Sequence, residues 1–287
     1  MYNILVTGAN GQLGSEIRVV ASKYSNYNFI FTDVQELDIC NHNGVQQFIA
    51  ENNINAIINC AAYTAVDKAE EQFEVADKIN HMAVANFAQI AKDNNIRLVH
   101  ISTDYVFDGK AYKPYTETDI PNPQSVYGRT KLAGETAMQH ISPANSIIIR
   151  TSWVYSSYGN NFVKTMLRLG KERDELNVVA DQIGTPTNAA DLAKAILEIL
   201  PKIENKEVEF FHYSNEGVCS WFDFAKAIFE IQDLRIKIKP IETWQFPTPA
   251  KRPFYSVLNK NTIKKKYKVE VPYWRNALKE SLNKIED

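Results

Sequence analysis

The residues best placed to do chemistry in this sequence are Tyr127 and Lys131, which lie four positions apart in the segment Tyr127-Gly-Arg-Thr-Lys131. On a helix, positions i and i+4 share a face, so the lysine ammonium would lie beneath the tyrosine ring. A nearby cation favours the phenolate and makes the tyrosine a better acid toward a carbonyl that receives hydride. Such pairs also arise by chance on ordinary amphipathic helices, so the spacing alone does not establish catalysis.

A glycine-rich turn near the start of the chain suits a dinucleotide. Gly8, Gly11 and Gly14 follow an apolar run, in a spacing that differs from the more common Gly-x-Gly-x-x-Gly. Glycines here permit a tight turn and close approach of the backbone to a pyrophosphate, and a helix beginning at this point offers free N–H groups to phosphate. The predicted contacts of this turn are Gly8, Asn10, Gly11, Gln12, Leu13 and Gly14.

An aspartate follows the next apolar run, where an adenosine ribose is expected. Asp33 comes about twenty residues after the glycines, the separation at which a carboxylate accepts hydrogen bonds from ribose hydroxyls. This position favours NADH, because a 2′-phosphate would meet like charge; a plain turn aspartate is the alternative. Further residues expected to border the cofactor are Asp38, Ile39, Ala61, Ala62, Tyr63 and Thr64.

Elements of a parallel sheet surround these motifs. Short apolar runs alternate with helical patterns at 45–51 and 83–92, which predicts an α/β fold with a Rossmann-type doubly wound sheet and right-handed crossovers. The strands are expected at 3–7, 29–32, 56–59, 97–101 and 146–150.

The sequence pattern changes beyond about residue 155, where loops that contain proline separate the helical stretches. We therefore expect residues 1–155 to form a dinucleotide-binding Rossmann domain. Residues 156–287 are expected to form a smaller substrate-binding part, with segments interleaved with the first domain. Helices are predicted at 162–171, 189–200 and 221–231, and a last helix from about residue 273.

Composition narrows the class of protein. Hydrophobic residues make up 45% and charged residues 23% of 287 residues, as in globular proteins, and a net charge of -2 argues against nucleic-acid or anionic-membrane partners. No apolar run is long enough to span a bilayer. The 3 cysteines lack metal-ligand spacing and are expected as reduced thiols in the cytoplasm. A monomer and a homodimer are both open.

Longer blocks of the sequence carry a family resemblance. They are 7–14, 59–70, 102–109, 127–135, 150–155, 159–162, 181–187 and 252–253, and together they cover nearly the whole chain. These blocks resemble the dTDP-4-dehydrorhamnose reductase family within the extended short-chain dehydrogenases/reductases. The resemblance implies reduction of the 4-keto group of dTDP-4-dehydro-L-rhamnose, with NADPH or NADH, to give dTDP-L-rhamnose for cell-surface polysaccharide.

The resemblance also implies a role for individual residues. Thr103 would hydrogen-bond the keto oxygen, Tyr127 would protonate it, and Lys131 would hold the nicotinamide ribose and tune the phenol. Two hydroxyl donors suit this task, because they stabilise the alkoxide as it forms. The matching positions near the substrate are Thr103, Asp104, Tyr105, Trp153, Asn161 and Arg252. For Trp153 a place in the core is an alternative, and for Arg252 a surface ion pair.

A metal site is doubtful on the same comparison. Some members of the family bind Mg²⁺ through carboxylates at a dimer interface, and Glu16 matches one of these ligands. Ala190 stands where a second glutamate is found, and the neighbouring Asp191 is turned away by about 100 degrees on a helix. We therefore do not expect a metal-bridged dimer, and we expect Glu16 to face solvent.

Two other functions remain as alternatives. A regulatory subunit of methionine adenosyltransferase resembles these reductases but acts as a binding partner, and nucleotide-sugar epimerases or dehydratases also use Tyr-x-x-x-Lys. The intact set of Thr103, Tyr127 and Lys131 favours an enzyme over the regulatory subunit. The blocks 102–107 and 150–155 favour the reductase over the epimerases and dehydratases.

Overall fold

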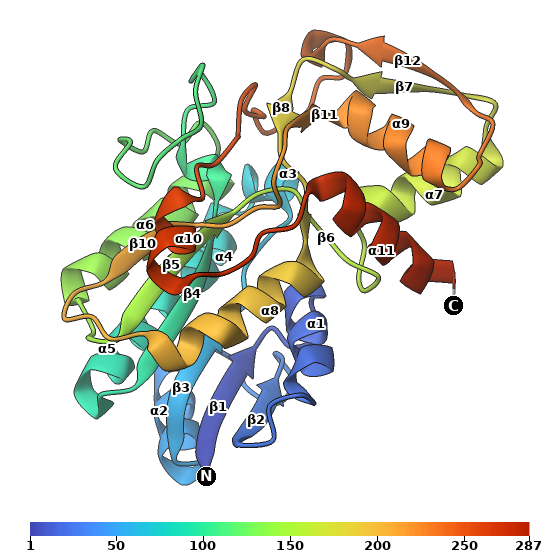
Figure 1. Cartoon of the computed structure of the whole chain (residues 1–287). Coiled ribbons are helices and arrows are strands. Elements are labelled where there is room, and N and C mark those ends of the chain that lie inside the picture. Colours follow the sequence, from blue (N-terminus) through green and yellow to red (C-terminus); the bar gives the residue numbers. More distant parts are fainter. Residues whose placement is uncertain (287) are drawn as a thin grey trace.

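A parallel sheet forms the centre of the computed structural model, which describes residues 1–286 (Figure 1). Its 6 strands are ordered β10-β5-β4-β3-β1-β2, and every neighbouring pair is parallel. The predicted Rossmann-type fold is confirmed, and β10 is an additional strand that the apolar pattern did not reveal. The strands are β1 (Tyr2–Thr7), β2 (Tyr27–Thr32), β3 (Ile54–Asn59), β4 (Arg97–Thr103), β5 (Ser146–Thr151) and β10 (Glu209–His212).

Alternate side chains of the strands enter two separate hydrophobic layers. On β1, Ile4 and Val6 join the layer under α1 and α8, whereas Leu5 joins the layer under α2, α5 and α6. Burial on both faces explains why these strands appear in the sequence as continuous apolar runs. The covering helices are α1 (Gln12–Ala21) and α8 (Ala189–Ile199) on one face, and α2 (His42–Glu51), α5 (Ala83–Asn94) and α6 (Val126–Ile141) on the other.

A second lobe lies beside the carboxyl edge of the sheet and has its own core (Figure 1). Leu278 and Leu282, on the last helix, are fully buried in that core. Two parallel strands lie on this lobe as a small sheet. Its main elements are α7 (Phe162–Glu172), α9 (Trp221–Ile231), α11 (Trp274–Glu286), β7 (Glu175–Val179) and β12 (Lys237–Ile241).

The chain passes between the two lobes several times. After α7 and β7 it returns to the sheet, where α8 packs on α1 and β10 pairs with β5. Short strands mark the crossings: β6 (Val154–Tyr155) pairs with β9 (Thr187–Asn188), and β8 (Ile183–Gly184) with β11 (Cys219–Ser220). The remaining elements are α3 (Val66–Ala69), α4 (Phe73–Asp77), η1 (Lys78–Met82), η2 (Asp104–Val106), η3 (Leu200–Lys202), η4 (Thr243–Gln245) and α10 (Asn261–Tyr267).

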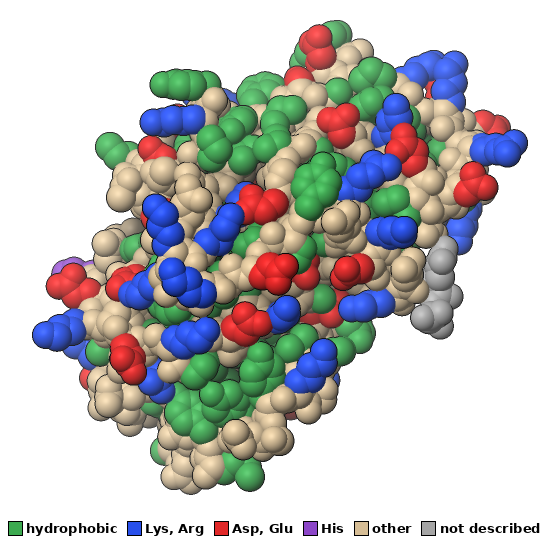
Figure 2. Space-filling model, viewed as in Figure 1, with side chains coloured by type: hydrophobic (Ala, Val, Ile, Leu, Met, Phe, Trp, Pro, Cys, Tyr) green, Lys and Arg blue, Asp and Glu red, His purple; other side chains and the backbone are tan. Residues whose placement is uncertain are grey.

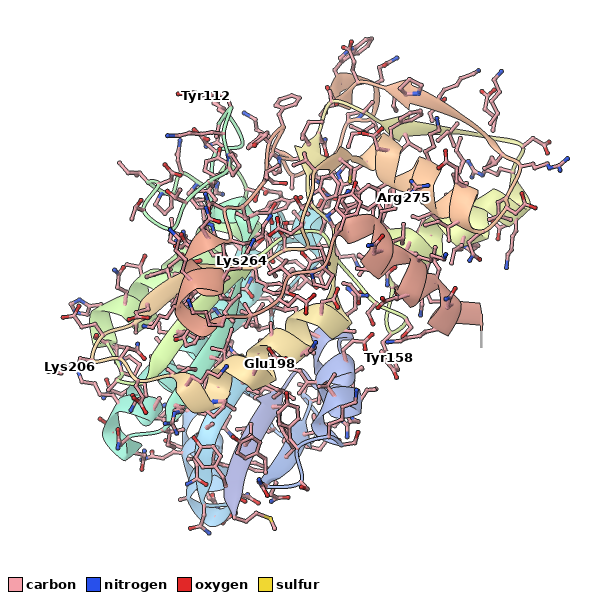
Figure 3. The ribbon with its side chains drawn as sticks, viewed as in Figure 1. Tyr112, Tyr158, Glu198, Lys206, Lys264 and Arg275 are labelled. Carbon is pink, nitrogen blue, oxygen red and sulfur yellow. The ribbon has the colours of Figure 1, made fainter. Side chains whose placement is uncertain are left out.

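The long loop between η2 and α6 is tied to the segment before α10. Tyr115 donates its N–H to the Val257 carbonyl over 2.9 Å and accepts from the N–H of Asn259 over 2.8 Å. Tyr112 lies at the tip of this loop and is 91% exposed (Figure 3). The base of the loop is therefore fixed by backbone bonds, while its tip faces solvent.

The surface is mixed in charge. Figure 2 shows Lys and Arg side chains interspersed with Asp and Glu over the visible face. Within residues 1–286, no helix is long and apolar enough to cross a membrane.

Candidate active site

A cavity of about 720 Å³ opens where the sheet strands end and the second lobe begins. Its volume suits a small-molecule site, and ligands of doubly wound sheets bind at this edge. Trp221 on α9 closes the cavity from the second lobe. The predicted site residues that line it are Gly8, Gly11, Gln12, Leu13, Asp33, Asp38, Ile39, Ala61, Ala62, Thr64, Thr103, Asp104, Tyr105, Tyr127, Lys131 and Trp153.

The glycine turn forms one end of this cavity. Gly8 has a φ of 63°, and a Cβ there would lie 2.7 Å from the backbone of Ala61. A Cβ on Gly14 would lie 2.4 Å from the Gly8 carbonyl oxygen, so the start of α1 packs directly on the turn. Gly11 provides no side-chain cap, which leaves first-turn N–H groups available to an anion. These features fit the pyrophosphate of a dinucleotide.

Asp33 lies beside the same turn, at the end of β2. Its Oδ2 accepts the N–H of Asn10 over 3.0 Å, so the carboxylate is held where the cavity widens. Tyr63 is turned away: its N–H donates to Asn80 Oδ1 over 2.9 Å, and its hydroxyl donates to Gln72 over 2.7 Å. Of the predicted cofactor contacts, Asn10, Gly14 and Tyr63 are therefore adjacent to the cavity wall rather than part of it.

Tyr127 enters the cavity from the first turn of α6. The helix begins after Ser125, whose hydroxyl accepts the N–H of Gly128 over 3.1 Å. A Cβ on Gly128 would lie 2.3 Å from the Tyr105 carbonyl oxygen, so only glycine lets α6 approach η2 this closely. The rings of Tyr105 and Tyr127 then meet edge to face, with centroids 5.4 Å apart. Local sequence thus determines where the phenol lies.

The protonation of Tyr127 differs from the expectation. The sequence predicts that a neighbouring ammonium lowers the pKa of the phenol, but burial raises the pKa of Tyr127 to about 12. The neighbouring Thr103 hydroxyl acts against this rise, and the charge of Asp104 adds to it. The Nζ of Lys131 donates to the Ile101 carbonyl over 2.7 Å. The phenol therefore holds its proton firmly at neutral pH.

Lys131 lies in the floor of the cavity with very little exposure. Its Nζ donates to the Ile101 carbonyl over 2.7 Å and lies 3.3 Å from Nε2 of His100. Burial lowers the pKa of Lys131 to about 8, and the charge of Glu135 acts in the opposite direction. The sequence reasoning overlooked His100, because a lone histidine within an apolar strand carries no motif of its own.

Thr103 is the last residue of β4 and is linked to its neighbour. Its hydroxyl donates to Oδ1 of Asp104 over 3.0 Å and accepts the N–H of Tyr105 over 3.2 Å. Asp104 is 3% exposed, and burial raises its pKa to about 7, against the opposing hydrogen bond from Thr103. Hydroxyls of Thr103 and Tyr127 thus share one wall of the cavity with a carboxyl that is half protonated near neutral pH.

Two stacked tryptophans also line the cavity. The rings of Trp153 and Trp221 are 3.6 Å apart and nearly parallel, at 10°. Trp153 has a φ of 49°, and a Cβ on Gly184 would lie 2.7 Å from its ring, so glycine makes room for the indole. Trp153 is half-buried: it lines the cavity and also packs against the core of the second lobe. Trp221 is a functional candidate that the sequence reasoning missed, since it comes from a distant helix.

Asn161 and Arg252 are engaged in other contacts. The Oδ1 of Asn161 caps α7, and its Nδ2 donates to Gln12 Oε1 over 3.0 Å. Arg252 forms an ion pair with Asp67, with an N–O distance of 2.6 Å. The neighbouring Asn160 lines the cavity, whereas Asn161 and Arg252 do not. Contacts of these two side chains with a substrate, as the family resemblance implies, would need these partners to be exchanged.

Glu16 is not solvent-facing as expected. It is 4% exposed, because the second lobe covers this part of α1, and its Oε1 accepts the hydroxyl proton of Ser156 over 2.8 Å. Asp191 accepts from Nδ2 of Asn215 over 2.7 Å. Among the residues that the structure describes, no group of three His, Cys, Asp or Glu side chains is arranged to hold a metal ion.

Comparison with known proteins agrees with this geometry. Residues 2–286 match the family described as the RmlD substrate binding domain. A dTDP-4-dehydrorhamnose reductase of Aggregatibacter actinomycetemcomitans is 42% identical over 97% of this chain and 98% of its own length. The crystal structure of such a reductase from Clostridium acetobutylicum is 48% identical, with a TM-score of 0.94 over 99% of this chain and 100% of that one.

A second similar structure was determined with a dinucleotide bound. The dTDP-4-dehydrorhamnose reductase of Bacillus anthracis, determined in complex with NADP, is 40% identical and has a TM-score of 0.94 over 99% of this chain and 100% of that one. Full-length similarity at this level, together with the match over residues 2–286, leaves no part of the fold outside the resemblance. The chain belongs to the RmlD substrate binding domain family.

Proposed function

We propose that this chain reduces the 4-keto group of dTDP-4-dehydro-L-rhamnose to give dTDP-L-rhamnose, with NADPH or NADH as the reductant. The observation that carries the proposal is the convergence of two hydroxyls, those of Tyr127 and Thr103, on a cavity that begins at a dinucleotide turn. Full-length relatives named dTDP-4-dehydrorhamnose reductase support the choice of sugar.

The cofactor is assigned to the end of the cavity formed by Gly8, Gly11 and the start of α1. When bound, it supplies a hydride from the nicotinamide ring. Asp33 is placed to accept hydrogen bonds from an adenosine ribose, which favours NADH, whereas the Bacillus anthracis relative was determined with NADP. Ala61 and Ala62 border the middle of the cavity, where the dinucleotide passes from one end to the other.

The residues of the chain handle the proton. A carbonyl that accepts hydride becomes an alkoxide, and Tyr127 donates its phenolic proton to that oxygen. Thr103 lines the same cavity, and its hydroxyl turns from Asp104 Oδ1 to stabilise the same oxygen by a hydrogen bond. Lys131 compensates the phenolate that remains, since its Nζ lies in the floor of the same cavity. Trp153 and Trp221 offer an apolar face to the pyranose ring and exclude water.

The division of labour between the lobes follows from this assignment. We place the cofactor on residues 1–155 and the sugar against residues 156–287, with α8 and β10 as the segments that interleave with the first part. The reaction is assigned to the cytoplasm, where cysteines such as the free thiols at Cys40, Cys60 and Cys219 stay reduced.

The direct test is oxidation of NADH and NADPH, followed by absorbance, with dTDP-4-dehydro-L-rhamnose as the acceptor. The wild type should oxidise at least one cofactor, and Tyr127→Phe should lose at least about a hundredfold in kcat/KM. Tyr213→Phe is the matched control, because Tyr213 is a fully buried phenol outside the cavity. An inactive wild type would contradict the reductase assignment, and a fully active Tyr127→Phe would remove Tyr127 from the role of acid.

A further inference from the structure

A row of polar side chains crosses the sheet beneath Lys131. Thr7, Asn59 and His100 occupy paired positions on β1, β3 and β4, because the register aligns Thr7 with Asn59 and Asn59 with His100. Ile57, two residues before Asn59, belongs to the layer under α6, so the polar row faces the same helix. Each of the three is at most 1% exposed. Buried polar groups of this kind must satisfy one another.

One backbone group determines the direction of every hydrogen bond in the row. The N–H of Ala61 can only donate, and it lies 3.2 Å from Oδ1 of Asn59, which also accepts the Thr7 hydroxyl over 2.7 Å. The other end of the amide, Nδ2, therefore faces His100 and lies 3.1 Å from its Nδ1. Because an amide NH₂ only donates, Nδ1 of His100 is an acceptor.

The imidazole must then carry its proton on Nε2. Burial and the charge of Lys131 both lower the pKa of His100 well below its usual value, so the ring is neutral. The protonated Nε2 lies 3.3 Å from Nζ of Lys131, which also donates to Ile101. An uncharged amine satisfies both contacts, since it accepts from the ring and donates to the carbonyl. An ammonium would direct one of its N–H groups at the N–H of the ring.

We propose that His100 is a positioning residue for Lys131, whose Nε2–H tautomer, imposed by Asn59 and Ala61, opposes the charged form of the lysine. The consequence for the reduction proposed above is an upper pH limit that His100 sets, because a lysine that loses its charge no longer compensates the phenolate of Tyr127. Only this kinetic consequence depends on the proposed function.

The other charged groups near Lys131 act in the opposite direction. Glu135, one turn further along α6, favours the ammonium. That carboxylate is already paired in two contacts with Arg150 on β5, over 2.9 and 2.6 Å. Tyr127, on the same helix, is protonated at neutral pH and contributes no charge. His100 is therefore the titratable side chain in direct contact with the amine.

The first arm of the test measures the tautomer in the protein without added ligand. Long-range ¹H–¹⁵N spectra of ¹⁵N-histidine-labelled protein at neutral pH should show His100 protonated on Nε2 and bare on Nδ1. His212 is an internal control with the opposite pattern: it is equally buried, but its Nδ1 lies 3.1 Å from the Tyr115 carbonyl, which can only accept. Substitutions His100→Gln and His212→Gln assign the signals. A proton on Nδ1 of His100 overturns the proposal.

The second arm measures the lysine. The ¹³Cε signal of Lys131, assigned through Lys131→Arg, is titrated in the wild type and in His100→Gln. A glutamine can turn its oxygen toward the amine, so the variant should titrate about one pH unit higher than the wild type. An unchanged or lower midpoint in a folded His100→Gln overturns the proposal.

A second variant protects the test against misfolding of the first. In Asn59→Asp the carboxylate accepts where the amide donated, so His100 should move its proton to Nδ1, free Nε2 to accept, and raise the Lys131 midpoint. If the Lys131 midpoint rises without this change of tautomer, the negative charge of the new aspartate alone would explain the rise, and the proposal would be contradicted. The high-pH limb of kcat/KM should shift with the midpoint. Loss of reductase activity in the wild type would instead contradict the function and leave both spectroscopic results standing.

Discussion

The two ends of the cavity are assembled in different ways. The cofactor end is made by one short stretch, in which Gly8, Gly11 and Gly14 bring backbone groups together without help from side chains. At the sugar end, side chains from separate segments meet, and Trp153 after β5 stacks on Trp221 of α9. A site that consecutive backbone residues form can be recognised from a sequence motif. A site formed by side chains from distant segments has no such motif, because only the fold brings them together.

The contrast extends to how each end tolerates change. The glycine turn has no space for a side chain, because a Cβ on Gly8 would lie 2.7 Å, and a Cβ on Gly14 2.4 Å, from the nearest backbone atom. The sugar end is formed by side chains, such as the stacked rings of Trp153 and Trp221, and a side chain can change its rotamer when a neighbour is replaced. We therefore expect the largest effects from the cofactor end and graded effects from the sugar end.

The largest effect is predicted for Gly8→Ala. The new Cβ would collide with Ala61 and the residue would keep a φ of 63°, so the turn must open and cofactor affinity should fall at least about a hundredfold. Gly159→Ala is the matched control: it has the same φ of 63°, but its Cβ would meet only the Gln12 side chain, at 3.2 Å. Calorimetric titration with NADH and NADPH measures both variants, and equal losses would show that backbone strain, not the collision, is responsible.

Sequence reasoning predicted the parts of the molecule that consecutive backbone residues form. It did not predict the parts that side chains from distant segments form together. The apolar runs predicted the strands β1 to β5, and the predicted α/β fold is confirmed. β10 was missed because Glu209–His212 is short and its first residue is charged. The burial of Glu16 was also missed, since the second lobe that covers it is distant in sequence. His100 and Trp221 acquire their meaning only from the neighbours that the fold provides.

A second effect, about tenfold, is predicted at the sugar end. Trp221→Ala removes the ring on which Trp153 stacks, so the KM for the nucleotide sugar should rise about tenfold while cofactor affinity stays the same. Trp244→Ala is the control, because Trp244 is 74% exposed and lies outside the cavity. Steady-state kinetics with each substrate varied in turn separates the two ends. A parallel loss of cofactor affinity would contradict their independence.

A smaller effect, on cofactor preference, is predicted for Asp33, the side chain that is expected to contact the ribose at the cofactor end. Asp33→Ser removes the charge that a 2′-phosphate would meet, and the ratio of kcat/KM for NADPH over NADH should rise about fivefold. The serine also loses the carboxylate that accepts the Asn10 N–H, so binding of both cofactors should weaken somewhat. A ratio that does not move would place the ribose elsewhere.

The smallest effect concerns stability and the carboxyl at the sugar end. In the folded protein burial raises the pKa of Asp104 to about 7, whereas the unfolded chain titrates near the ordinary value of 3.8. A group whose pKa is raised on folding stabilises the protein at low pH, and this contribution is lost as pH rises through the interval up to about 7. Asp104→Asn lacks that loss, so its Tm relative to wild type should increase by about 3 °C between pH 5 and pH 8.

The matched control is a carboxyl group whose pKa is shifted in the opposite direction on folding. Asp108 is a partly exposed carboxylate whose pKa is lowered by the hydrogen bond that it accepts from the Tyr115 hydroxyl. Asp108→Asn removes a contribution that is present above the unfolded pKa, so its Tm relative to wild type should not increase from pH 5 to pH 8. Scanning calorimetry at several pH values tests both variants. Parallel curves for the two would mean that Asp104 is charged in the folded protein, and the Thr103 hydroxyl would then keep its hydrogen bond to that carboxylate instead of turning to a keto oxygen.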